Sequence, residues 1–183
     1  MRLSPADVMT VPNAVTAAGF ALVAHGAQRL DTPHGAAEVV VGRLCDLVDG
    51  AVARHTGQTS EFGAGLDATA DKVGLAIIGT QMVRRGILPV SIAAGMAVQN
   101  AANTVATIVA KQRHPEIELQ PSTSGKIAMA AQNLAAGAYL TAELTKNSRP
   151  RLSCAARKLG FIAGWFGIGI GASATYHYFD RAR

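Results

Sequence analysis

The sequence has few charged residues and only two cysteines. Charged residues make up 16% of its 183 residues, whereas roughly a quarter is usual for soluble proteins. Cys45 and Cys154 lack the spacing of a metal site and predict no disulfide framework. The net charge is +5, but no run of five basic residues occurs, so nucleic-acid binding is not predicted. Composition alone leaves a soluble helical protein and a membrane protein open.

Apolar and small residues dominate what is present. Apolar residues make up 49% of the chain, but the mean hydropathy is only +0.22, because Ala, Gly, Ser and Thr replace much of the Leu and Ile. Small residues let transmembrane helices approach closely. Two uncharged segments, Ile87–Ala110 with 24 residues and Leu159–Phe179 with 21, match the roughly 20 helical residues that cross a bilayer core of about 30 Å. The sequence therefore favours an integral membrane protein.

The fold class that we predict is all-α, a polytopic membrane bundle of about six transmembrane helices that forms a single domain over residues 1–183. The expected helices cover residues 12–30, 34–55, 63–84, 87–111, 124–146 and 155–179. The second contains Glu38 and Arg43 within an apolar stretch. Ionisable groups in such helices are costly and usually face a protein interior or a water-filled cavity. The basic residues are balanced between the two ends of the bundle, so their distribution does not decide the orientation.

Four aspartates form two pairs with helical spacing. Asp46 and Asp49 are three residues apart and Asp67 and Asp71 are four apart, so each pair shares one helix face. The polar, glycine-containing segment 55–62 between them is long enough to reverse the chain. An antiparallel helix pair would bring all four carboxylates together at one end.

The four carboxylates indicate a divalent metal ion. They cannot all stay ionised near a low-dielectric core without compensation, and oxygen-only ligands favour Mg²⁺ or Mn²⁺ over zinc. Protein-bound Mg²⁺ commonly also holds substrate phosphates, so a phosphate-bearing substrate is expected. Gly50 and Ala53 leave one helix face bare for a ligand, and Arg54 carries a planar fork suited to phosphate. The simpler alternative, solvated aspartates at helix ends, fits one pair better than two pairs in apolar helices.

These residues also resemble a known signature. From Asp46 to Asp71 the chain matches D-x2-D-G-x2-A-R-x8-G-x3-D-x3-D at every fixed position, and this signature is typical of the CDP-alcohol phosphatidyltransferases. Pro12, Asn13 and Thr16 resemble the Pro-Asn-x-x-Thr segment with which that family enters its first helix. The expected six-helix layout is also similar to the family.

A third segment bears on the acceptor alcohol. Gly125 and Lys126, followed by Gln132, resemble the Gly-Lys segment of members similar to phosphatidylglycerophosphate synthase and cardiolipin synthase. Those members usually carry threonine near the position of Met129, where this chain departs. The resemblance therefore suggests glycerol 3-phosphate as acceptor and keeps inositol phosphate and phosphatidylglycerol as alternatives.

The resemblance implies a reaction and a location. The acceptor hydroxyl would attack the lipid-side phosphorus of CDP-diacylglycerol, giving a phosphatidyl alcohol and releasing CMP. The enzyme would depend on Mg²⁺ or Mn²⁺ and lie in the cell membrane, in contact with its lipid, with the active site facing the cytoplasm. We also expect a homodimer.

The resemblance also implies residue roles. The metal ligands would be Asp46, Asp49, Asp67 and Asp71, and Asp71, the last in the motif, would also act as general base. CDP-diacylglycerol would be bound by Asn13, Gly50, Ala53, Arg54 and Gly63. From their position near the expected cytoplasmic helix ends, the candidates for acceptor binding are Lys126, Arg113 and Lys111. Each of these three could instead be a cation that reaches out to the membrane interface.

Two other classes of protein stay open. A transporter with intramembrane aspartates would explain polar groups within apolar helices, but it does not explain the spacing of Gly, Ala and Arg in the motif. A non-catalytic partner subunit of the same family is the second alternative, and the complete set of aspartates argues against it.

Overall fold

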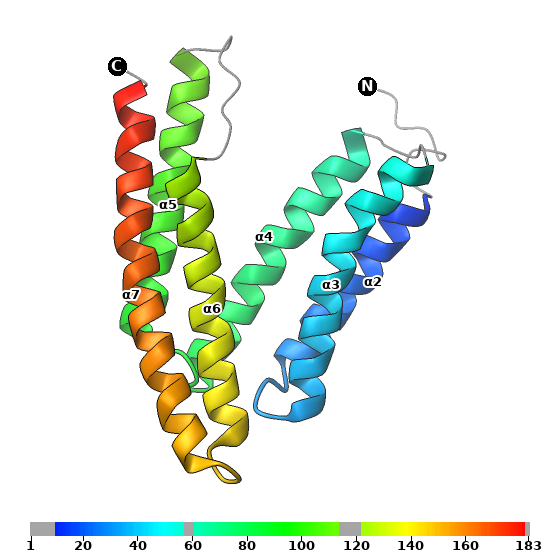
Figure 1. The fold of residues 1–183 in the computed structure, drawn as a ribbon. Coiled ribbons are helices and arrows are strands. Elements are labelled where there is room, and N and C mark those ends of the chain that lie inside the picture. Colours follow the sequence, from blue (N-terminus) through cyan, green and yellow to red (C-terminus); the bar gives the residue numbers. More distant parts are fainter. Residues whose placement is uncertain (1–9, 57–60, 114–121, 182–183) are drawn as a thin grey trace. The chain divides into compact units, whose positions relative to one another are not determined.

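The computed structural model describes residues 10–56, 61–113 and 122–181, and within these ranges the chain consists of α-helices and short turns. The helices are α2 (Val11–Ala27), α3 (Pro33–Thr56), α4 (Glu61–Arg84), α5 (Val90–Arg113), α6 (Thr123–Thr145) and α7 (Pro150–Arg181), shown in Figure 1. For the described residues, the prediction of an all-α bundle with six helices is confirmed.

The predicted helices correspond one to one with the observed ones, and the largest difference at a helix start is in α7. It begins at Pro150, about five residues before the predicted start. Proline suits the first turn of a helix because its φ is already close to helical and its missing N–H needs no partner there. The backbone N–H of Ser153 donates to the carbonyl of Arg149 at 3.0 Å, which closes this first turn.

The chain divides into two compact units, Met1–Arg85 and Gly86–Arg183. The first contains α2, α3 and α4, and the second contains α5, α6 and α7. A single domain over residues 1–183 stays a prediction.

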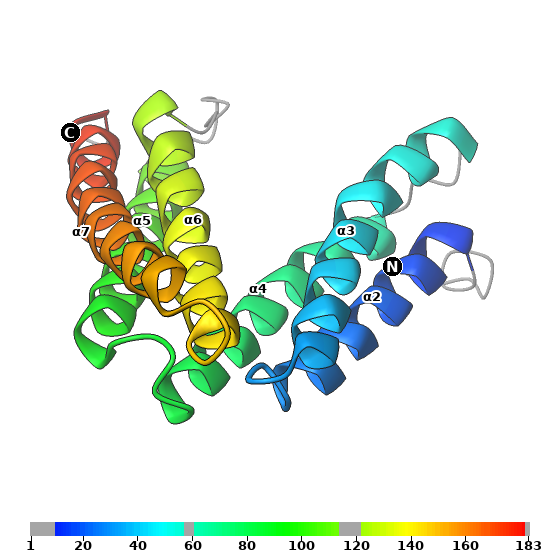
Figure 2. The same ribbon diagram turned by 60° about the horizontal axis from the view of Figure 1, so that its bottom comes forward.

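Glycine contacts hold α2 and α3 of the first unit together. A Cβ on Gly42 of α3 would lie 2.5 Å from the carbonyl oxygen of Gly19, and a Cβ on Gly26 of α2 would lie 2.6 Å from that of Gly35. The two backbones therefore approach more closely than alanine would allow, as small residues permit in membrane bundles. Figures 1 and 2 show the two helices side by side. This contact positions the helix that carries the first aspartate pair.

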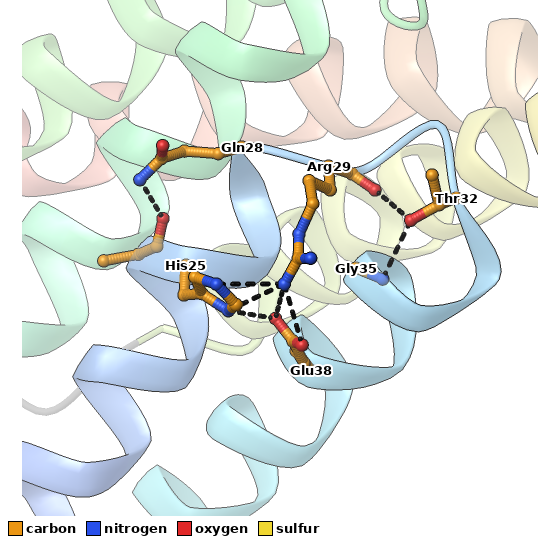
Figure 3. Close-up of polar contacts among 7 residues, drawn as sticks. His25, Gln28, Arg29, Thr32, Gly35 and Glu38 are labelled. Carbon is orange, nitrogen blue, oxygen red and sulfur yellow. Dashed lines mark hydrogen bonds and ion pairs between the residues drawn. The ribbon is translucent and has the colours of Figure 1, made fainter.

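A polar cluster surrounds the turn between α2 and α3 (Figure 3). The Thr32 hydroxyl donates to the carbonyl of Arg29 at 2.8 Å and accepts from the backbone N–H of Gly35 at 3.1 Å. The Glu38 carboxylate lies 2.7 Å from His25 Nδ1 and 3.2 Å from the Arg29 guanidinium. Glu38, one of the two ionisable residues in the apolar stretch of α3, is thus compensated within the protein.

In the second unit, α7 packs on both α5 and α6, and Figure 2 shows it beside them. The contacts involve a face of small residues on α7. This face repeats at intervals of four, three and four residues: Gly160, Gly164, Gly167 and Gly171. A Cβ on Gly164 would lie 2.9 Å from Ile92 of α5, and one on Gly160 would lie 2.8 Å from the ring of Tyr139 of α6. The absent side chains of α7 therefore make room for larger residues of its two neighbours.

Side-chain amides that lie against this glycine face link α5 to α6. Gln132 of α6 donates from Nε2 to Gln99 Oε1 at 2.7 Å, and Asn100 of α5 donates from Nδ2 to Gln132 Oε1 at 3.0 Å. A Cβ on Gly171 would lie 2.5 Å from the Gln99 amide, so glycine is needed for this arrangement. In a bilayer such interhelical amide bonds are worth about 0.6–2 kcal/mol each.

Two helices have the length and apolar character of membrane spans. They are α5, which contains an 18-residue window of mean hydropathy 1.2, and the Pro150–Tyr176 part of α7, whose corresponding window has a mean of 1.3. Large apolar side chains are exposed on the same helices: Val98, Val105, Ile108, Phe161, Ile162, Trp165 and Phe166. A soluble protein rarely exposes so many large apolar groups together. These features support membrane association, and a span for each of the other four helices stays a prediction.

Candidate active site

The two aspartate pairs lie on α3 and α4, near the ends that these helices share. Figure 1 shows that α3 ends and α4 begins at the same end of the first unit. Asp46 lies ten residues before the end of α3 and Asp71 ten residues after the start of α4, both about 15 Å along the helix axis. Asp49 and Asp67 lie seven and six residues from the same ends, about 10 Å along. Asp46 and Asp71 therefore lie at about the same distance along their helices from the shared ends, and so do Asp49 and Asp67.

Two of the four carboxylates belong to the described side chains. Asp67 and Asp71 are half-buried on α4, whereas the side chains of Asp46 and Asp49 lie outside the described part. Among the described side chains, no group of three or more His, Cys, Asp or Glu lies together in a way that could hold a metal ion. The four-aspartate metal site stays a prediction, and its all-carboxylate donor set fits Mg²⁺ or Mn²⁺.

The small residues of the motif lie on the same helix segments. Ala53 is half-buried near the end of α3, and Gly63 is half-buried at the start of α4. Gly50 belongs to the helical backbone of α3, but its surroundings and the side chain of Arg54 lie outside the described part. Their assignment to CDP-diacylglycerol stays a prediction.

An ion pair joins α3 to α4 at the level of the motif. Arg43 Nη1 donates to Asp71 Oδ1 at 2.7 Å, and the two side chains are 33% and 36% exposed. Arg43 precedes Asp46 by three residues and therefore lies on the same face of α3. Sequence reasoning noted Arg43 only as a costly charge and did not assign it to the site. The sequence feature that could have assigned Arg43 to the site is its position in an apolar helix, one turn before the aspartate motif.

A small crevice lies beside this ion pair, where α2, α3 and α4 meet. It has about 10 Å³ of water-accessible space, which is room for about one water molecule. Its lining comes from all three helices: Thr16, Gly19, Phe20, Val23, Gly42, Arg43, Ala70 and Gly74. This crevice is too small to hold a nucleotide.

The Pro-Asn-x-x-Thr segment forms the first turns of α2. Thr10 is the N-cap, and its hydroxyl accepts from the backbone N–H of Asn13 at 3.3 Å. Thr16 donates from its hydroxyl to the carbonyl of Pro12 at 3.1 Å. Asn13 and Thr16 are both buried, and Thr16 lines the same crevice as Arg43. The segment therefore contributes to the packing beside the ion pair, and substrate binding by Asn13 stays a prediction.

The three candidates for acceptor binding belong to the second unit. Lys111 and Arg113 are exposed in the last turn of α5, and Lys126 is exposed near the start of α6. Ser122 is the N-cap of α6, and its hydroxyl accepts from the backbone N–H of Gly125 at 3.1 Å. The positive end of the α6 dipole and the Lys126 ammonium thus favour an anion in the same region. Binding of the acceptor there stays a prediction.

Comparisons with known proteins bear on the family that the motif resembles. No curated protein and no solved structure shows significant similarity to the chain. Residues 9–172, however, match the family described as CDP-alcohol phosphatidyltransferase. The match includes both compact units and extends far beyond the motif between Asp46 and Asp71. The chain therefore belongs to the CDP-alcohol phosphatidyltransferase family.

Proposed function

We propose that this protein transfers the phosphatidyl group of CDP-diacylglycerol to glycerol 3-phosphate and releases CMP at the cytoplasmic face of the cell membrane. Membership of the family implies transfer of a phosphatidyl group from a CDP-alcohol to an alcohol acceptor. The observation that carries the proposal for this chain is the complete motif on the adjoining ends of α3 and α4. Inositol phosphate and phosphatidylglycerol are the alternative acceptors.

Asp46, Asp49, Asp67 and Asp71 would hold Mg²⁺ or Mn²⁺. A divalent ion bound there would neutralise the diphosphate of the donor and the charge of the departing CMP. The carboxylates suit this role because they supply only oxygen ligands. Family members are generally dependent on a divalent metal ion.

The remaining motif residues would bind the donor and move the proton. As the acceptor oxygen attacks the lipid-side phosphorus, the bond from that phosphorus to the oxygen of CMP breaks. Asp71 would take the hydroxyl proton, for which a carboxylate suffices when the proton leaves late in the attack. Arg54 would pair with the diphosphate through its planar fork. The small residues Gly50, Ala53 and Gly63, with Asn13, would contact the rest of the donor.

Measurement of CMP release tests the proposal. Purified protein in detergent is supplied with CDP-diacylglycerol, Mg²⁺ and one acceptor at a time: glycerol 3-phosphate, inositol phosphate or phosphatidylglycerol. We expect the fastest release with glycerol 3-phosphate. Faster release with one of the other two would reassign the acceptor, whereas no release with any of them would favour an intramembrane-aspartate transporter or a non-catalytic subunit.

Lys126 is expected to bind the phosphate of the acceptor. Loss of a charge-assisted hydrogen bond typically costs about 1.5–3 kcal/mol, which is roughly tenfold to more than a hundredfold in affinity. Lys126→Ala should therefore raise the KM for glycerol 3-phosphate by this factor and leave the KM for CDP-diacylglycerol nearly unchanged. Steady-state kinetics with each substrate varied in turn measure both constants.

Lys146→Ala is the matched control, because Lys146 caps the opposite end of α6 and pairs with Glu143 there. It should leave both constants within about twofold of wild type, which corresponds to less than about 0.5 kcal/mol. Equal behaviour of the two variants would show that Lys126 only reaches out to the membrane interface.

Gly50 is expected to lie against the donor. Gly50→Leu should raise the KM for CDP-diacylglycerol at least about tenfold or abolish its binding, because the larger side chain occupies space that the ligand needs. Gly79→Leu in α4 is the control, since a Cβ at Gly79 would have no atom within 4 Å apart from the adjacent backbone of its own helix. A stable Gly50→Leu enzyme with wild-type kinetics would refute the assignment of the pocket.

We also propose that the protein is an integral membrane homodimer. The apolar character of α5 and α7 supports insertion, and extraction only by detergent, not by salt or alkali, would test it. Mass measurement of the detergent-solubilised protein by light scattering would test the dimer, and a monomeric mass would refute it.

A further inference from the structure

Arg43 lies in a part of α3 where a charge is costly. Its neighbours Val40, Val41 and Leu44 are apolar and exposed at the surface of the first unit. In a helix that we propose to span the membrane, an arginine among such residues needs a partner, and a charged residue in this setting is often functional.

Arg43 pairs with the last aspartate of the motif. The 2.7 Å contact between Arg43 Nη1 and Asp71 Oδ1 connects residues that are 28 positions apart in the sequence. Arg43 lies one helical turn from Asp46, further from the α3–α4 connection than any of the four aspartates. The guanidinium therefore reaches Asp71 from the side opposite the connection.

The contact between Arg43 and Asp71 bears on the repulsion among the carboxylates when no metal ion is bound. Four aspartates on two adjoining helix ends repel one another, and the low dielectric of a membrane protein strengthens that repulsion. A divalent ion removes it only while it is bound. The metal-free protein must also fold and persist, and a cation close to the carboxylates lowers this repulsion.

We propose that Arg43 is a positioning residue that serves as a built-in counter-charge for the metal site. It holds Asp71 while the site has no metal, and it yields this carboxylate to Mg²⁺ or Mn²⁺ when the ion binds. The inference rests on the proposed metal site, to which it adds a residue outside the motif. Two opposite consequences follow: Arg43 stabilises the metal-free protein, and it weakens metal binding.

Neutralising Arg43 is therefore expected to have effects of opposite sign on stability and on affinity. In excess EDTA, Arg43→Gln should lower the melting temperature of the purified protein in detergent by about 2–6 °C, the range of a modest destabilisation in a chain of this size. Saturating Mn²⁺ should remove most of this difference. The affinity for Mn²⁺, measured from the electron paramagnetic resonance signal of the free ion, should rise about tenfold. Neither readout depends on catalysis.

Two further single variants distinguish the effect of losing the ion pair from the effect of changing the net charge of the protein. Lys72→Gln removes the same charge from an exposed residue adjacent to Asp71 in sequence and should change the melting temperature and the Mn²⁺ affinity far less. Arg43→Lys keeps the charge and should restore most of the stability in EDTA. Equal effects of Arg43→Gln and Lys72→Gln, or weaker Mn²⁺ binding by Arg43→Gln, would overturn the inference.

If Arg43→Gln folds poorly, the double variant Arg43→Gln/Asp71→Asn still tests the counter-charge role. It removes both charges, so in EDTA it should be more stable than Arg43→Gln alone, and an equal or lower stability would refute the counter-charge role. Absence of Mn²⁺ binding by the wild type would instead refute the proposed metal site. The two failures are distinguishable because the comparison of variants in EDTA involves no metal.

Discussion

Replacement of Asp67 by asparagine is expected to reduce CMP release on the order of a thousandfold or more. The change keeps the size of the side chain but removes one of the carboxylates proposed to hold the metal ion. A metal ion that neutralises a diphosphate contributes several kcal/mol, and each 1.4 kcal/mol corresponds to a factor of ten in rate. Asp46→Asn should have the same effect, and excess chelator should abolish release by the wild type until Mg²⁺ or Mn²⁺ is restored.

Asp31→Asn is the matched control for this prediction. Asp31 lies in the turn between α2 and α3, at the other end of α3 from the motif, and pairs with Arg85. The control removes a carboxylate from the same unit and should retain most of the activity. Full CMP release in excess chelator would contradict the metal site, and equal losses in Asp31→Asn and Asp67→Asn would indicate a general loss of folding.

Gly42→Ala is expected to destabilise the first unit strongly. The new Cβ would lie 2.5 Å from the carbonyl oxygen of Gly19 and 2.8 Å from a methyl group of Val23. Real Cβ atoms do not approach a backbone oxygen this closely, so α2 and α3 must move apart. Overpacking of a tight contact costs about 3 kcal/mol at the upper end of the usual range, and this corresponds to a loss of roughly 6–12 °C in melting temperature.

The control for Gly42→Ala is Gly79→Ala, also within a helix of the first unit. A Cβ at Gly79 would have no atom within 4 Å apart from the adjacent backbone of its own helix, and alanine favours a helix more than glycine does. Gly79→Ala should therefore keep or slightly raise the melting temperature. A Gly42→Ala protein as stable as the control would show that α2 and α3 are not held by direct backbone contact.

The positions of the helices could be predicted from the sequence because their signals are local. Long apolar runs gave α5 and α7, and turn residues separated them from their neighbours. The early start of α7 at Pro150 was not predicted, because the first turn contains charged residues that do not continue the apolar run. The spacing of the aspartates likewise predicted that each pair shares one face of its helix, α3 or α4.

The partners between helices could not be predicted in the same way. Arg43 and Asp71 are 28 residues apart, and Gln99 and Gln132 are 33 apart. Helical periodicity tells which residues share one face of a helix. It does not tell which neighbouring helix packs against that face. The contacts of Gly42 with Gly19 and of Gly171 with Gln99 depend on the same rotation and translation of whole helices.

The sequence by itself thus determined that the described part of the chain forms six helices and that the chain belongs to the CDP-alcohol phosphatidyltransferase family, because both are encoded in local runs and fixed spacings. Only the tertiary structure decided that Arg43 compensates Asp71 and that glycines set the closeness of α2 and α3. The physical reason is that a helix face finds its partner through close packing of the whole unit, and close packing is a property of all its residues together.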